Sequence, residues 1–335
     1  MTAIAERFSG CLLAGAIGDA MGAPVEFMSS VEIDSLTHGE GVNQFYQAYG
    51  KLGAITDDTQ MTLFTCEALL QASNDGTFNS EQVIVYFNQA YLHWLNTQQE
   101  ASPLPLTYTS HLLNVPVLNA RRAPGITCIT ALRNKPSLQA LAENQSKGCG
   151  GVMRAAPVGL FAVRKALSDE VTFRLGAQCA HVTHGHPTGY LSAGLFAVII
   201  RCLIQGMTLR AAIDVGLLEL QRHNGHEETL LSVQRALMLS ATGLSHRQAI
   251  QMLGEGWVAE EALAIALYCV LVAKDFSQLI NYSVSHGGDS DSTGSIAGNL
   301  WGAMHGLNGI PLPWLAQLEA HQCINQMALA LHDCA

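Results

Sequence analysis

Two short acidic segments, far apart in the 335-residue sequence, carry the residue types best suited to chemistry. The first is residues 56–59 (TDDT), and the second is residues 289–292 (DSDS), which lie within a run of glycine, serine and threonine. Each directly precedes a helical pattern, so capping of a helix N-terminus explains part of both. Capping does not explain two carboxylates separated by one residue and flanked by hydroxyl groups. Such oxygen donors are hard ligands suited to Mg²⁺ or Mn²⁺.

Two other motifs compete for the second segment. Residues 289–294 imitate the opening of a calcium-binding EF-hand loop, but the twelfth position is Leu300, where that loop requires a bidentate Glu. Calcium sensing is therefore excluded. A phosphatase of the DxDxT type remains the enzyme alternative, although its motif should end a buried hydrophobic strand and residues 283–288 (SVSHGG) are polar and rich in glycine.

The helices that must position these segments share a spacing of small residues. A helix expected over residues 295–305 and the N-terminal helix each carry a small residue at every fourth position. These are Gly294, Gly298, Gly302 and Gly306 in the first, and Gly10, Ala14, Gly18 and Gly22 in the second. A glycine inside a helix costs about 1 kcal/mol relative to alanine, and such a stripe lets another backbone approach closely. We therefore expect the two helices to cross in close contact and to bring the acidic segments together with Asp19.

The remaining chain has the apolar periodicity of helices and almost no strand-type alternation. Turn chemistry separates these segments, and we find no repeat and no linker rich in Pro, Ser or like charges. The sequence therefore predicts one all-α domain over residues 1–335, an orthogonal bundle of about a dozen helices. The least regular stretches, 27–54 and 100–128, are candidate walls of a cleft.

Composition excludes several classes of protein. Hydrophobic residues make up 49% of the chain, enough for a sizeable core, and a net charge of −10 argues against a surface that wraps nucleic acid. The nine cysteines form no CxxC pair, which fits a reducing cytoplasm. No signal peptide is expected, and the most apolar run, residues 191–204, contains Arg201 and is too short for a membrane span.

Five motifs in order along residues 15–293 resemble the ADP-ribosylglycohydrolases, a family that includes the dinitrogenase reductase-activating glycohydrolase and the mammalian ADP-ribosylhydrolases. Besides the two acidic segments, they are residues 15–26 (GAIGDAMGAPVE), 148–157 (GCGGVMRAAP) and 183–190 (THGHPTGY). The resemblance implies an all-α fold with two metal ions, Mg²⁺ or Mn²⁺, at the base of a cleft.

The resemblance also assigns residues by motif. The metal ligands it implies are Thr56, Asp57, Asp58, Asp289, Asp291 and Ser292. The backbone N–H groups of the 148–153 loop would bind the diphosphate, and His184 would face ribose or phosphate. The expected substrate-binding set is Gly148, Gly150, Gly151, Val152, Met153, His184 and Trp257, and Trp257 is a candidate to stack on a base or a guanidinium. Glu261 is a candidate to hold a cationic leaving group, and Arg154 either fastens a loop or touches phosphate.

The expected activity is hydrolysis of the bond between ADP-ribose and a modified protein side chain. An acidic group activates water, and the candidates are Glu26, Asp58, Asp289 and Asp291. The motifs look more like those of arginine-directed members than of serine-directed ones. Two alternatives stay open: another ADP-ribosylated substrate (serine, nucleobase or small metabolite), and an immunity-type protein that blocks a cognate ADP-ribosyltransferase.

Overall fold

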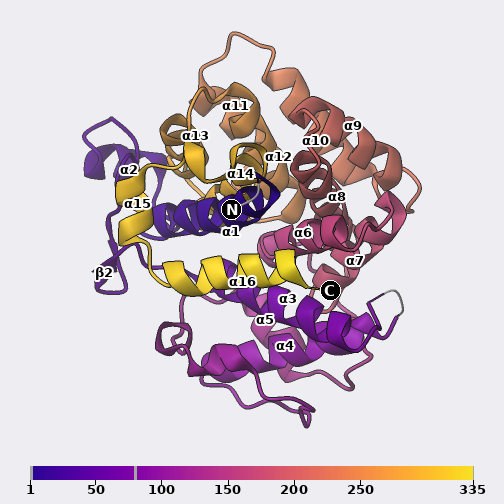
Figure 1. Cartoon of the computed structure of the whole chain (residues 1–335). Coiled ribbons are helices and arrows are strands. Elements are labelled where there is room, and N and C mark those ends of the chain that lie inside the picture. The colour runs from indigo at the N-terminus through magenta and orange to yellow at the C-terminus, as the bar shows by residue number, and fades with distance from the viewer. Residues whose placement is uncertain (1–2, 79–80, 335) are drawn as a thin grey trace.

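The computed structural model describes residues 3–78 and 81–334, and this part of the chain is almost entirely helical (Figure 1). Its α-helices are α1 Ala3–Gly22, α2 Ser30–Leu36, α3 Asp57–Asn74, α4 Val83–Thr97, α5 Ile126–Arg133, α6 Ala156–Arg164, α7 Asp169–His181, α8 Pro187–Ile204, α9 Leu209–Leu220, α10 Glu227–Leu239, α11 His246–Leu253, α12 Ala259–Val272, α13 Phe276–Val284, α14 Ser290–His305, α15 Leu312–Gln317 and α16 His321–Asp333. Four short 3₁₀ helices are η1 His111–Asn114, η2 Pro116–Leu118, η3 Cys149–Gly151 and η4 Gly306–Gly309. The strands β1 Gln47–Ala48 and β2 Lys51–Leu52 pair as an antiparallel hairpin.

The all-α fold predicted from the sequence is confirmed, with more helices than the expected dozen. The excess comes from helices such as α2, α11 and α15, which have 7, 8 and 6 residues. Elements of little more than two turns or fewer are too short to show a clear helical period in the sequence. The predicted irregular stretches also contain short elements: α2 and the hairpin in 27–54, and η1 and η2 in 100–128.

The close crossing of the two glycine-striped helices is confirmed for α1 and α14. A Cβ added to Gly298 would lie 2.1 Å from the Ala14 carbonyl oxygen, and one added to Gly302 would lie 2.0 Å from that of Gly10. Near the other end of the pair, a Cβ on Gly18 would lie 2.0 Å from the carbonyl oxygen of Gly294. The helices therefore run antiparallel, which places the C-terminal end of α1 beside the N-terminal end of α14.

The α14 helix begins earlier than the sequence pattern indicated. It starts at Ser290 rather than Ser295, with Asp289 as its N-cap. The residues before it form α13 and a short loop, so no strand precedes the DxDxT sequence. The structure therefore lacks the strand that the phosphatase alternative requires at this position.

The α8 helix lies inside the molecule. By length and composition, Pro187–Ile204 is apolar enough to cross a membrane, but 83% of it is buried within the protein. It packs against α6, α7 and α9. This extent of burial is typical of a core helix.

Replacing Gly298 with alanine should destabilise the protein, although alanine is the better helix former. The added methyl group would lie 2.1 Å from the Ala14 carbonyl oxygen, so α1 and α14 would have to separate. We expect a loss of about 1–3 kcal/mol in the free energy of unfolding, the usual cost of overpacking, measured by chemical denaturation. The control is Gly243→Ala, where the methyl group meets nothing within 4 Å. Equal stability of the two variants would contradict the close crossing.

Candidate metal and substrate site

The first acidic segment caps and begins α3. Thr56 is the N-cap, and its side-chain oxygen accepts a hydrogen bond from the Asp58 N–H at 3.2 Å. Asp57 Oδ2 accepts a hydrogen bond from the Gly125 N–H at 3.2 Å. Asp58 is 2% exposed, and its Oδ1 has no hydrogen-bond partner among the residues that the structure describes. The segment thus acts as a helix cap and still presents a buried carboxylate oxygen that is free to bind a ligand.

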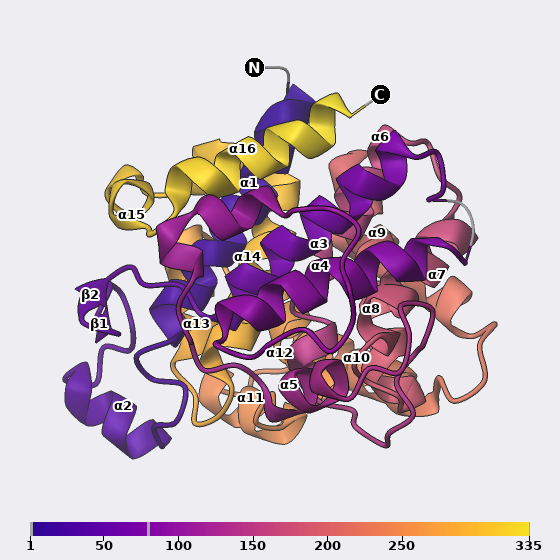
Figure 2. The ribbon, with the colours of Figure 1, turned by 90° about the horizontal axis from the view of Figure 1, so that it is seen from below.

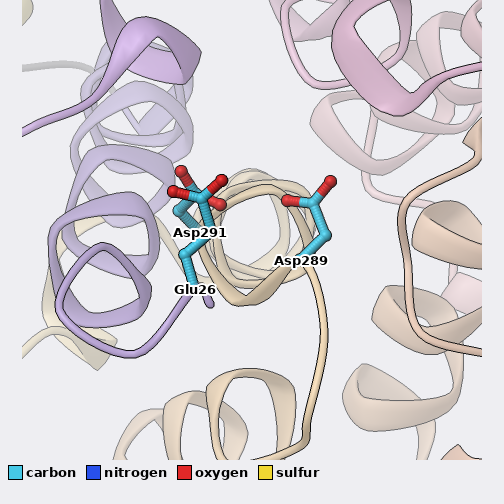
Figure 3. A group of neighbouring side chains, drawn as sticks. All are labelled: Glu26, Asp289 and Asp291. Atoms are coloured by element: carbon cyan, nitrogen blue, oxygen red, sulfur yellow. The ribbon is translucent and has the colours of Figure 1, made fainter. Parts of the chain in front are cut away.

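The second segment begins α14 and meets Glu26, which lies just beyond the end of α1. Asp289 Oδ1 and Asp291 Oδ1 both accept from the Ser292 N–H, at 3.4 and 3.0 Å. One carboxylate oxygen of each of Glu26, Asp289 and Asp291 lies within 4.8 Å of the other two. Figure 3 shows these three side chains around the start of α14. All three residues are buried. Three acids from two distant parts of the sequence therefore form one buried group of oxygen donors that are close enough together to share a cation.

Asp19 ties the first segment to α1. Its fully buried carboxylate accepts hydrogen bonds from the Thr56 N–H at 3.0 Å and the Thr59 N–H at 3.1 Å, and from the Thr59 hydroxyl. Burial and the nearby Asp291 carboxylate raise the pKa of Asp19 to about 7. Asp19 is therefore a positioning residue that fixes the start of α3 against α1.

Burial raises the pKa of every carboxyl group here, including Asp291, and repulsion by neighbouring carboxylates adds to it for the others. Burial and repulsion raise the pKa of Glu26 to about 10, with Asp291 as its strongest acidic neighbour. The pKa values of Asp57, Asp58 and Asp289 lie well above their usual range for the same two reasons. None of the ion pairs among the described residues involves these acids. Clustered acids without a cationic partner are a donor set that fits hard divalent cations.

A cavity of about 340 Å³ opens above the carboxylates. Of the predicted residues, its lining contains Glu26, Asp57, Asp58, Asp289, Asp291, Ser292, Gly148, Gly150, Met153, His184 and Trp257. Thr56, Gly151 and Val152 are buried and are not part of that lining within the described chain. The structure therefore gathers most of the predicted site into one cavity and leaves those three beneath its surface.

His184 and Arg154 belong to one buried network behind the 148–153 loop. His184 Nδ1 lies 2.8 Å from the Thr183 hydroxyl, and burial followed by the Arg154 charge lowers the pKa of His184 to about 3. Arg154 donates to the Thr183 hydroxyl at 2.7 Å and to the Cys179 carbonyl at 2.8 Å, and its guanidinium stacks on Tyr91. Arg154 therefore fastens the loop, and His184 is a neutral hydrogen-bonding group in the cavity wall.

Sequence reasoning missed Cys149 and Phe27. The Cys149 thiol donates a hydrogen bond to Asp289 Oδ2 at 2.6 Å and lines the cavity. Phe27 stacks on Trp257, with ring centroids 5.7 Å apart and planes 18° apart. Cys149 stands inside the glycine-rich motif and Phe27 follows Glu26 directly, so their positions beside predicted site residues were the available signal.

The loop before α12 joins the two halves of the cavity. The Glu255 carbonyl accepts from the Asp289 N–H at 2.9 Å, and the Trp257 carbonyl accepts from the Cys149 N–H at 3.2 Å. Glu261 accepts from the N–H groups of Glu255 and Gly256 at 3.0 and 3.2 Å. The structure thus uses Glu261 to hold this loop, and Glu261 is not in the cavity lining of the described residues.

The fold and the site together define a class of all-α proteins. In this class, an acidic cavity suited to metal ions lies where the ends of two closely crossing helices meet. A solved structure described as an ADP-ribosylglycohydrolase-related protein complex shares this fold, with a TM-score of 0.73, 23% identity and 99% of each chain covered. The family model for ADP-ribosylglycohydrolase matches residues 1–335. The chain therefore belongs to the ADP-ribosylglycohydrolase family.

Relatives with different stated roles cover nearly the whole chain. An ADP-ribosylhydrolase ARH3 from Danio rerio is 26% identical over 98% of this chain and 90% of its own length. The ADP-ribosyl-[dinitrogen reductase] glycohydrolase of Rhodospirillum rubrum is 24% identical over 94% of this chain and 90% of its own. The ADP-ribosylarginine hydrolase Tri1 of Serratia proteamaculans is 23% identical over 96% and 78%. These comparisons support ADP-ribosyl hydrolysis and leave the acceptor group open.

In chelator, the free energy of unfolding should fall as pH rises from 7 to 8. The pKa values of Asp19 and Glu26 in the folded chain are raised to about 7 and about 10, whereas unfolded carboxyl groups titrate at about 4. The folded chain therefore binds more protons than the unfolded chain in this window, so rising pH favours unfolding. Excess Mg²⁺ or Mn²⁺ should remove most of this fall. Chemical denaturation at several pH values measures it.

Glu26→Gln is the matched variant for that experiment because it keeps the shape of the side chain and removes its titration. Its stability in chelator should depend less steeply on pH than that of the wild type. A wild-type stability that is flat or rises between pH 7 and 8 would show that the carboxylates are not crowded as described.

Proposed function

We propose that this protein is a metal-dependent hydrolase that removes ADP-ribose from a modified protein side chain, with arginine as the acceptor. The observation that carries the proposal is the buried carboxylate group at the floor of a cavity that the 148–150 loop and His184 also line. Family membership gives the class of reaction. We place this activity in the cytoplasm, since all nine cysteines are free thiols.

Two Mg²⁺ or Mn²⁺ ions are the proposed cofactors. Asp58 is the best-supported ligand, because its buried Oδ1 lacks a partner among the described residues. Asp57, Asp289, Asp291 and Ser292 line the same cavity. Thr56 would contribute from beneath the cavity surface. When bound, the ions supply charge that lowers the pKa of water and orients the ribose hydroxyl groups.

The carboxylates would perform the remaining chemistry. Glu26, Asp289 and Asp291 lie close enough together to act on one reacting centre. One of them, or Asp58, takes a proton from the attacking water, the new C–O bond forms at the anomeric carbon, and the C–N bond to the guanidino group breaks. The carboxyl group that received the proton from water returns it to the leaving nitrogen as the bond breaks. Negative charge around this centre stabilises the oxocarbenium-like transition state.

The rest of ADP-ribose has space beside the reacting centre. A cavity of about 820 Å³ shares Ile126 and Thr127 with the site cavity and includes Ser146 and His181. We propose that the ligand crosses from the carboxylates past Gly148 and Gly150 into this second cavity. The loop between them would contribute backbone N–H groups to the diphosphate, and His184 a neutral ring nitrogen to ribose or phosphate. Gly151 and Val152 support the loop from below.

The arginine assignment depends on the motifs and on the names of relatives. One relative's name specifies ADP-ribosylarginine, another names dinitrogen reductase and a third names no acceptor. The half-exposed Trp257 side chain lines the cavity with Glu255 beside it, since its Nε1 donates to Glu255 Oε2 at 3.2 Å. An aromatic face next to a carboxylate suits a cationic guanidinium better than a hydroxyl group.

The purified protein should release ADP-ribose from an arginine-modified protein in Mg²⁺ or Mn²⁺, and excess chelator should stop the reaction. Asp291→Asn should lower kcat at least about a hundredfold, because it removes a charge from the reacting centre. Glu67→Gln is the control, since Glu67 is also buried but accepts hydrogen bonds from the Ser110 hydroxyl and the His111 N–H outside the cavity. Parallel product analysis on arginine-, serine- and nucleobase-linked ADP-ribose identifies the acceptor. Full activity in chelator, or in Asp291→Asn, would refute the proposal.

A further inference from the structure

A second depression in the surface adjoins the site cavity, on the side of Phe27 and Trp257. This cavity of about 470 Å³ lies between the start of α2 and the end of α11, and we call it the α2–α11 groove. It shares Glu26, Phe27 and Trp257 with the site cavity. Figure 2 shows α2 and α11 near the same lower edge of the molecule. The groove is therefore continuous with the place where the glycosidic bond would be cut.

Two large apolar side chains of the groove lining, Phe27 and Trp257, are exposed, and two more, Val31 and Met252, directly follow lining residues in the sequence. We call these four side chains the rim. Phe27 is 76% exposed, Val31 73%, Met252 50% and Trp257 38%. They come from two segments, around α2 and around the end of α11, whose neighbouring residues Ser30 and Gln251 line the groove. Exposed apolar side chains gathered around a depression mark a surface that a partner covers.

The two walls of the groove are held to each other. The Arg247 guanidinium of α11 makes a paired contact with the Asp34 carboxylate of α2, at 2.8 and 2.5 Å. Asp34 and Arg247 neutralise each other, so the acidic side chains left in the groove lining are those of Glu26 and Glu255, and Glu255 is the one that carries charge near neutral pH. The groove is thus a preformed surface, with an apolar rim and carboxyl groups where it meets the site.

We propose that the α2–α11 groove binds the polypeptide of the substrate protein around its modified residue. The inference rests on the proposed function: with ADP-ribose in the site cavity and its anomeric carbon near Glu26, the acceptor side chain extends past Phe27 and Trp257 into the groove. A cationic side chain would lie against the stacked rings with Glu255 nearby, and apolar residues around it would cover the rim. The groove then makes the enzyme prefer modified proteins to free modified amino acids.

The test compares two substrates in the full-length protein. One is a carrier protein mono-ADP-ribosylated on a single surface residue through the linkage that the enzyme cleaves, and the other is the matching free ADP-ribosyl amino acid. The variant is Val31→Glu with Met252→Gln, which makes the exposed rim polar and changes no residue of the site cavity. We expect KM for the modified protein to rise about tenfold and kinetics on the free amino acid conjugate to stay unchanged.

The matched control is Leu231→Glu with Met238→Gln on α10. Leu231 is 65% exposed and Met238 58%, and α10 contributes nothing to the lining of the groove or the site cavity in the described chain. The control variant should have the same kcat and KM as the wild type on both substrates. Circular dichroism and thermal unfolding of both double variants verify folding.

The outcomes separate the two proposals. If the groove variant loses the same factor in kcat/KM on both substrates, or loses none on either, the docking inference is overturned. The proposed hydrolysis is not affected by that result. A wild-type dimer, detected by analytical ultracentrifugation, that dissociates in Val31→Glu/Met252→Gln would assign the rim to a second copy of this chain and also overturn it. Failure of the wild type to hydrolyse either substrate would instead reject the proposed function.

Discussion

The structure depends on burying several carboxylates against one another. Asp19, Asp58, Asp289 and Asp291 are each at most 4% exposed, and Glu26 is 7% exposed. Ionised groups in a dry interior repel strongly, so a fold that gathers them must offset that repulsion. The close crossing of α1 and α14 brings these carboxylates together. It leaves no room between the helix ends for intervening side chains, because a Cβ on Gly22 would lie 2.3 Å from the Ser290 carbonyl oxygen.

Backbone dipoles and hydrogen bonds offset part of this repulsion. Both α3 and α14 begin at the cluster, so their N–H groups and positive dipole ends point toward the acids. Asp19 accepts hydrogen bonds from the start of α3, and Cys149 donates one to Asp289. The pKa values of the clustered carboxyl groups nevertheless remain raised. The protein alone therefore does not supply enough positive charge to balance these acids. Divalent cations would supply the missing positive charge, and the proposed catalysis uses the ions held in this way.

Local patterns in the sequence were enough for the helical class and for the crossing, because both depend on spacing within one segment. The stripe from Gly294 to Gly306 predicts a close neighbour, whatever the rest of the chain does. The role of Cys149 depends on contacts between residues 140 apart, which no local pattern encodes. Glu261 illustrates the opposite error: an acid near the motif suggested a ligand contact, and the structure uses it to hold a loop through backbone N–H groups. Composition and the order of the motifs are enough to identify the residues near the site. The three-dimensional structure is needed to tell the residues that line the cavity from those that support it.

Anomalous diffraction from crystals soaked in Mn²⁺ tests the central claim most directly, because it places the ions without assuming any activity. We expect two peaks in the site cavity, with Asp58 Oδ1 within coordinating distance of one and carboxylate oxygens of the second acidic segment bound to at least one. Soaked crystals of Asp58→Asn should show a weaker peak or none at that position. Peaks elsewhere on the protein, or a cavity that holds no Mn²⁺ at millimolar concentration, would contradict it.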